Sequence, residues 1–84
     1  MEEEEVVGEV FKYFAKPGVA AINMTHGEIK IGDTIRIKGY TTDFTQKVES
    51  MEIDNVKVEK AEKGQSVGIK VIERVRPSDV VYRV

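Results

Sequence analysis

The sequence contains no cysteine and no tryptophan, and it has a single histidine, His26. Without cysteine, neither a disulfide framework nor a thiolate metal site can be built. One histidine argues against a histidine-based metal site and against a Ser-His-Asp mechanism. The seven glycines form no Gly-x-x-x-x-Gly-Lys-Ser/Thr loop, and neither Lys-Ser nor Lys-Thr occurs. GTP binding is therefore not expected, and we expect no cofactor, no bound metal and no catalytic residues.

Long hydrophobic runs are also missing. No apolar stretch approaches the roughly 20 residues that cross a bilayer as a helix, and the N-terminal Met-Glu-Glu-Glu-Glu is the opposite of a positively charged signal sequence. We therefore expect no membrane partner, and a cytoplasmic location agrees with the lack of cysteine.

Charge divides the chain into two parts. The formal net charge is −2, but Glu2, Glu3, Glu4 and Glu5 contribute four negative charges, so the rest is mildly basic. We predict an acidic, disordered tail over residues 1–5. The basic excess of the remainder neither requires nor excludes nucleic acid. Glutamine and asparagine are few beside lysine, glutamate, valine and isoleucine, a bias typical of thermophile proteins.

A chain of 84 residues is long enough for one domain, which we place at residues 6–84. Its apolar residues alternate with polar ones, as Ile35 and Ile37 do with Arg36 and Lys38, and this period of two predicts half-buried antiparallel strands. No segment carries the apolar 3,4 spacing of a helix, and residues 55–64 are expected to hold a short helical turn at most. The predicted strands cover residues 6–14, 19–24, 34–38, 45–53, 66–72 and 80–84, with a bulge near Glu49 and Ser50.

Six or seven short strands with regular turn signals predict an all-β fold, and we expect a small, closed, mostly antiparallel β-barrel. The stretch GEIKIGDTIRIKG, residues 27–39, fits this picture as a corner followed by a strand. Gly27 and Gly32 are predicted to supply the positive φ of two tight turns, and Pro17-Gly18 to form another. The glycines of this stretch are thus interpreted as geometry rather than as a binding loop.

Three segments, in the same order, resemble the second domain of translational GTPases. The run over residues 27–33 is similar to a G-x-[IL]-x-[VI]-G-D corner that follows a strand, here residues 18–22. Residues 61–69 are similar to an A-x-x-G-x-x-V-G-[IL] segment. Residues 76–81 look like the closing r-x-G-D-v-v, with Ser78 where glycine is usual. The resemblance covers residues 8–84 and includes Val48 to Met51 as a further strand.

This resemblance implies a six- or seven-stranded closed β-barrel in a stand-alone, translation-factor-like small protein. Its implied function is that of a non-catalytic binding module that contacts RNA, the ribosome or other parts of the translation machinery. The alternative is a protein–protein adaptor barrel, such as an accessory subunit of a larger enzyme. Similar barrels also occur at the end of a collagenase-like peptidase family and in small RNA–protein subunits, so the fold alone does not choose. A small enzyme is a third hypothesis, with the fewest residues to support it.

The loop over residues 39–47 is the strongest candidate for a contact site because it holds two aromatic residues among hydroxyls. Tyr40 or Phe44 is a candidate for stacking on a base or docking a partner, with Arg36, Lys38 and Lys47 holding phosphates or carboxylates nearby. The structural alternative is that Phe44 caps the barrel, Tyr40 covers a strand, and the cations form a solvated outer face.

The other polar residues that stand out are interpreted as turn residues. His26 lies in a Thr-His-Gly corner without a second ligand or base nearby in the sequence. Asp33 and Asp79 each precede a predicted strand, where aspartate commonly binds the local backbone.

Overall fold

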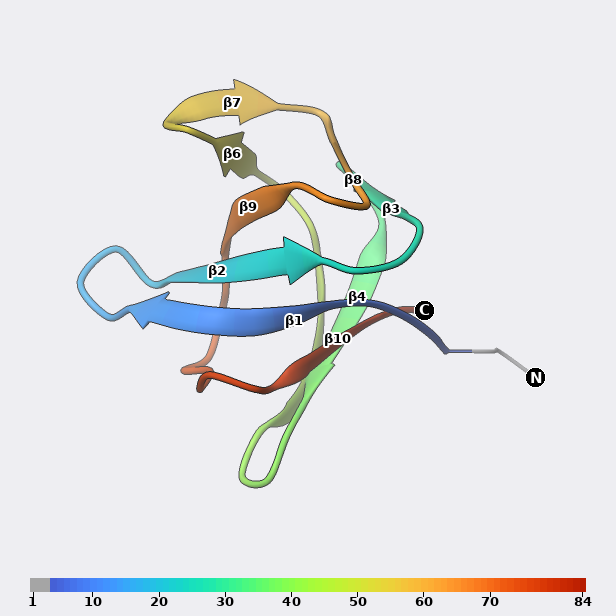
Figure 1. Ribbon diagram of the computed structural model, residues 1–84. Helices are drawn as coiled ribbons and strands as arrows, with labels where there is room; N and C mark the ends of the chain where they lie inside the picture. The colour runs from blue at the N-terminus through green and yellow to red at the C-terminus, as the bar shows by residue number, and fades with distance from the viewer. Residues whose placement is uncertain (1–3) are drawn as a thin grey trace.

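The computed structural model describes residues 4–84, which form ten strands and no helix (Figure 1). The acidic tail predicted for residues 1–5 lies largely outside the described residues, although Glu5 is already part of the first strand. No helix in the described chain is long and apolar enough to cross a membrane. The strands are β1 (Glu5–Phe14), β2 (Val19–Met24), β3 (Glu28–Lys30), β4 (Thr34–Lys38), β5 (Asp43–Lys47), β6 (Met51–Ile53), β7 (Val56–Val58), β8 (Lys60–Glu62), β9 (Ser66–Lys70) and β10 (Val80–Arg83).

Eight of the strands form one antiparallel sheet in the order β5-β4-β10-β1-β2-β9-β6-β7, and β3 and β8 form a separate two-stranded ribbon. The all-β, mostly antiparallel prediction is confirmed. The closed six- or seven-stranded barrel is wrong, because the end strands β5 and β7 do not pair with each other. The sheet curls into an open half-barrel, with the β4–β5 hairpin and the β6–β7 hairpin at its two ends (Figure 1).

The short ribbon of β3 and β8 helps to fill the concave side of the sheet. Ile29 and Ala61 are paired across the ribbon, and both side chains are fully buried. Backbone hydrogen bonds between Gly32 and Val48 (2.8 Å) and between Val48 and Asp33 (2.8 Å) tie the corner before β4 to the segment that follows β5. The core consists of Val7, Val10, Ala20, Ile22, Met24, Ile29, Ile35, Ile37, Phe44, Val48, Met51, Ala61, Val67, Ile69, Val71, Val75 and Val81.

The turns confirm the interpretation of the glycine-rich stretch as a scaffold. Gly27 has φ 59° and Gly32 has φ 96°, a backbone region that favours glycine because it has no Cβ. Asp33 accepts a hydrogen bond from the backbone N–H of Lys30 (2.9 Å), as expected for an aspartate in a turn. His26 is exposed, and its Nδ1 lies 2.9 Å from the hydroxyl of Thr25.

One prediction between residues 45 and 64 was wrong, and another was incomplete. The strand predicted over residues 45–53 is divided into β5 and β6, and the change of parity between Val48 and Met51 occurs in the linker between them rather than in a bulge. The segment predicted to hold at most a helical turn forms β7 and β8. Each of these strands has three residues, too few to show an alternation in the sequence.

Candidate functional site

The residues predicted to form a contact site lie on the β4–β5 hairpin, but they do not come together as one site. Arg36 is paired with Thr45, Lys38 with Asp43, and Lys47 with Thr34. The three cations therefore share the outer face of the hairpin. Lys38 and Lys47 lie at its opposite ends, about 13 Å apart at the strand rise of roughly 3.3 Å per residue.

The guanidinium of Arg36 is already hydrogen-bonded to two carboxylates. Its guanidinium donates to both oxygens of Asp43, at 2.8 Å each, and to Glu4 Oε2 at 2.6 Å. These bonds hold the pKa of Asp43 below its ordinary value and raise the pKa of Arg36. A phosphate at Arg36 would have to displace both carboxylates. In the described chain, Arg36 therefore forms structural ion pairs with Asp43 and Glu4.

The two aromatic residues of the predicted site have opposite environments. Phe44 is 8% exposed and belongs to the core, whereas the Tyr40 side chain is fully exposed at the tip of the hairpin. Phe44 therefore cannot stack on a base without leaving the core, which corrects its assignment as a contact residue. The exposed ring of Tyr40 remains able to contact a partner, but Phe44, the other aromatic residue of the predicted site, faces the core.

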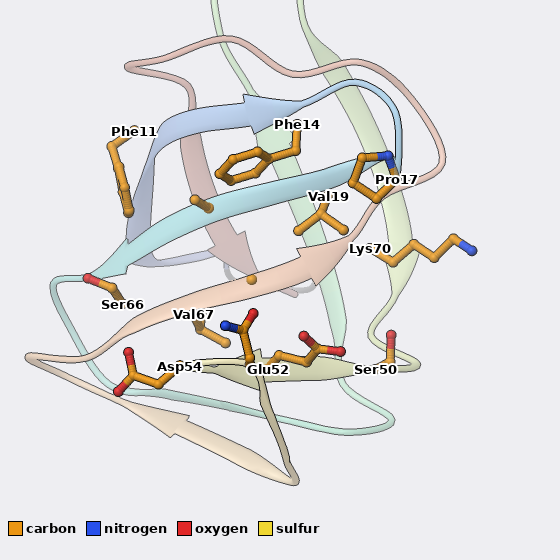
Figure 2. A pocket seen from close by; sticks show the side chains of 13 residues that line it. Phe11, Phe14, Pro17, Val19, Ser50, Glu52, Asp54, Ser66, Val67 and Lys70 are labelled. Atoms are coloured by element: carbon orange, nitrogen blue, oxygen red, sulfur yellow. The ribbon is translucent and has the colours of Figure 1, made fainter.

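A different surface has the shape of a binding site. A groove of about 580 Å³ crosses the outer face of the sheet over β1, β2, β9 and β6 (Figure 2), within the range of roughly 300–1,000 Å³ that is usual for ligand sites. Phe11 and Phe14 of β1 stand on one side of the groove and are 46% and 43% exposed. Its lining residues are Phe11, Phe14, Pro17, Val19, Ala21, Ser50, Glu52, Asp54, Asn55, Ser66, Val67, Gly68 and Lys70.

A β-bulge in β1 places both phenylalanines on the outer face. Val10 is paired with Ile22 and Lys12 with Ala21, so Phe11 is an extra residue in β1 at this step. In a regular strand, two residues three positions apart point to opposite faces. The extra residue reverses the parity, and Phe14 therefore points outward like Phe11.

The floor of the groove is made of small residues. Ala21 of β2 is paired with Gly68 of β9, and Gly68 is paired with Glu52 of β6. A Cβ atom on Gly68 would lie 3.3 Å from Val19 Cγ1, so a side chain at this position would crowd Val19. The absence of a side chain at Gly68 keeps the floor low between the phenylalanines and β6.

The two ends of the groove differ in charge. Lys70 is paired with Val19, next to Phe14 and Pro17, and Asp54 lies at the other end near Ser66, while Glu52 is paired with Gly68 between the two ends (Figure 2). All three charged side chains are exposed, and none of them takes part in an ion pair within residues 4–84. No sequence pattern indicated this site, because two residues three positions apart in a regular strand point to opposite faces.

Solved structures define the class of fold. The chain matches the C-terminal domain of a Geobacillus thermoleovorans protein proposed to be a U32 peptidase, with a TM-score of 0.88 over 95% of this chain and 92% of that domain, at 23% identity. A selenomethionine variant of the same domain gives a TM-score of 0.86 at 24% identity, over 92% of this chain and 96% of that one. The chain therefore has the fold of a peptidase C-terminal domain.

Curated relatives point the same way. A collagenase of Porphyromonas gingivalis is 50% identical over 78 residues, which are 92% of this chain and 22% of that protein. An uncharacterized protease of Methanocaldococcus jannaschii is 44% identical over 77 residues, 90% of this chain and 19% of that protein. The chain thus spans about a fifth of the length of the curated relatives it matches. No family model matches it.

These comparisons overturn the resemblance to translation factors. The similar proteins are named as collagenases, a protease and a peptidase domain, and they match 90% or more of this chain. The assignment as an RNA-binding, translation-factor-like module was therefore wrong. The corner and turn motifs that suggested this assignment are needed to form the curled sheet. Different protein families share such a sheet, so the motifs do not identify the family. The alternative, an accessory part of a larger enzyme, agrees better with the relatives.

Proposed function

We propose that this chain is a non-catalytic, protein-binding domain that works beside the catalytic part of a collagenase-type peptidase. The observation that carries the proposal is the 50% identity with a collagenase over 92% of this chain. Because the match comprises only 22% of that protein, the catalytic residues of the relative have room to lie elsewhere in its chain.

The residues of this chain support an accessory role. The single histidine is exposed at a turn and contacts a threonine hydroxyl, and the described residues contain no group of three or more His, Asp or Glu side chains placed to hold a metal ion. The groove beside Phe11 and Phe14 offers apolar surface and hydrogen-bonding groups, and the hydroxyl of Ser66 in its lining donates to the amide oxygen of Asn23 (2.7 Å) rather than to a base. Binding rather than bond cleavage is the chemistry that such a surface provides.

The location of the protein stays a prediction. Cysteine is absent, which agrees with a cytoplasmic protein, and the proposed function does not depend on it.

A domain replacement tests the proposal. In a chimera, the 78-residue matching segment of the Porphyromonas gingivalis collagenase is replaced by this chain, and in a linker variant it is replaced by a Gly-Ser linker. We expect the linker variant to lose kcat/KM on gelatin and the chimera to recover it. A short chromogenic peptide serves as the control substrate, because an accessory domain that holds a protein chain should affect it little. Equal gelatin hydrolysis by the chimera and the linker variant would contradict the proposal.

A further inference from the structure

We propose that the groove on the outer face of the sheet binds an extended peptide in the polyproline II conformation. One proline packs against each of Phe11 and Phe14, and a basic side chain lies beside Glu52 and Asp54. This inference rests on the proposed function, since it names the kind of protein segment that the accessory domain takes.

The spacing of the two phenylalanines supports this ligand. They are three residues apart on one face of β1, which is about 10 Å at the strand rise and somewhat less across the bulge. A polyproline II helix repeats every three residues with a rise of about 3.1 Å, so equivalent side chains recur about every 9 Å. Prolines three positions apart therefore match the separation of the two rings.

The hydrogen bonding of the groove floor argues against an added strand. The floor lies in the middle of the sheet, where β2 and β9 have partners on both sides. Their backbone groups are already used in the ladder, so an incoming chain has no free edge to extend here. A polyproline II chain makes no internal backbone hydrogen bonds and is recognised by its side chains on aromatic surfaces. This mode fits a floor made by Ala21 and Gly68.

The charges of the groove favour a basic residue at one end of the peptide. Phe11 lies toward the end with Asp54 and Ser66, Phe14 lies toward the end with Lys70, and Glu52 lies between the two ends beside Gly68 (Figure 2). The two unpaired carboxylates favour an arginine or lysine next to the proline at Phe11. Lys70 disfavours a second cation at the other end. The Nζ of Lys12 lies over the Phe14 ring, 5.0 Å from its centre, in a cation–π contact that leaves the other face of the ring for the ligand.

Peptide titration of the isolated chain tests the proposal, because the related Geobacillus domain was crystallised on its own. The ¹⁵N-labelled chain is titrated with a peptide of three Pro-Pro-Arg repeats, and amide shifts are followed by NMR. We expect shifts at Ala21, Gly68 and the β1 bulge. A Pro-Pro-Glu repeat should bind about threefold more weakly, and a flexible Gly-Ser-Arg repeat about tenfold more weakly, because it must be ordered on binding.

Variants locate the site. Phe14→Ala should weaken binding about tenfold, since it removes one buried ring contact. Phe14→Leu preserves more of the apolar contact and should show a smaller loss if Phe14→Ala proves poorly folded. Glu52→Gln should weaken binding of the arginine peptide about threefold and leave the glutamate peptide unchanged or improved. Tyr40→Ala, an exposed aromatic residue on the distant hairpin, is the matched control and should have no effect.

Three results would overturn the inference. The first is the absence of amide shifts in the groove at millimolar peptide, and the second is equal binding of the three peptides. The third is a groove covered by a second copy of the chain. Sedimentation would show this as a concentration-dependent dimer that Phe14→Ala abolishes. A working collagenase chimera without peptide binding rejects this ligand and leaves the proposed function intact. Peptide binding together with a failed chimera rejects the peptidase role, and the ligand assignment stands.

Discussion

Gly39 and Asp79 are packed so closely that a methyl group on Gly39 would lie 1.8 Å from the Oδ1 atom of Asp79. Asp79 is 4% exposed, and its Oδ2 accepts a hydrogen bond from the backbone N–H of Arg76 at 2.9 Å. Its backbone carbonyl accepts from the N–H of Val10 at 2.8 Å. The carboxylate therefore packs the turn before β10 against Gly39 at the start of the β4–β5 loop. A side chain at Gly39 would not fit beside it.

Gly39→Ala is expected to destabilise the domain by about 1–3 kcal/mol, because the new methyl group displaces a buried carboxylate or the loop backbone. Urea denaturation followed by circular dichroism measures the change in the free energy of unfolding. Asp79→Ala removes the clash but also a hydrogen-bond acceptor for the turn. The double variant should therefore lose less stability than the sum of the two single variants. Strict additivity would show that the close approach has no energetic consequence.

Ser78→Gly is expected to stabilise the domain. Ser78 has φ 79°, in the left-handed region that costs a residue with a Cβ about 1–2 kcal/mol. Part of this gain is offset by the greater freedom of glycine in the unfolded chain, which leaves a net gain of about 0.5–1 kcal/mol. Ser50→Gly is the control, since Ser50 is exposed and has no positive φ, and it should destabilise slightly. A lower melting midpoint for Ser78→Gly would contradict this argument.

The two aromatic residues of the β4–β5 hairpin should respond oppositely to truncation. Phe44→Ala removes a ring that is 8% exposed in the core and should cost about 3–5 kcal/mol, a large part of the stability of so small a domain. Tyr40→Ala changes a fully exposed side chain and should remain within about 0.5 kcal/mol of the parent. Thermal unfolding of both variants measures the difference. Similar melting midpoints would mean that Phe44 is not a core residue in solution.

The fold was predictable wherever strands are long enough to alternate. Residues 19–24 and 34–38 were placed to the residue, and the positive φ of Gly27 and Gly32 followed from turn chemistry. The three-residue strands β3, β7 and β8 were missed because pairing in three dimensions, not local pattern, decides them. Closure of the sheet was also predicted wrongly, since the pattern of alternation is the same for an open and a closed sheet.

The candidate site was less predictable than the fold. Aromatic residues in a loop directed attention to Tyr40 and Phe44, but the sequence does not show that Phe44 already belongs to β5 and faces the core. Phe11 and Phe14 were hidden within a strand, because their shared face depends on a bulge defined by the pairing with β2. The resemblance to translation factors rested on turn motifs, which describe a fold and not a partner.

Arg36 is expected to control the titration of Asp43. Its guanidinium donates two hydrogen bonds to this carboxylate and lowers the pKa of Asp43. Because the pKa is lower in the folded than in the unfolded state, the stabilisation is complete above about pH 4, the ordinary value for aspartate, and is lost as the pH falls through the folded pKa. Arg36→Gln should therefore raise the pKa of Asp43 toward its ordinary value.

Carboxyl carbon NMR between about pH 2 and pH 6 follows this change directly. Glu62 provides an internal control, because Lys60 lies 2.8 Å from it and lowers its pKa independently of Arg36. The pKa of Glu62 should be the same in the parent and in Arg36→Gln, while that of Asp43 rises. If neither value changes, the Arg36–Asp43 pair is not maintained in solution. Arg36 would then keep only its hydrogen bond to Glu4.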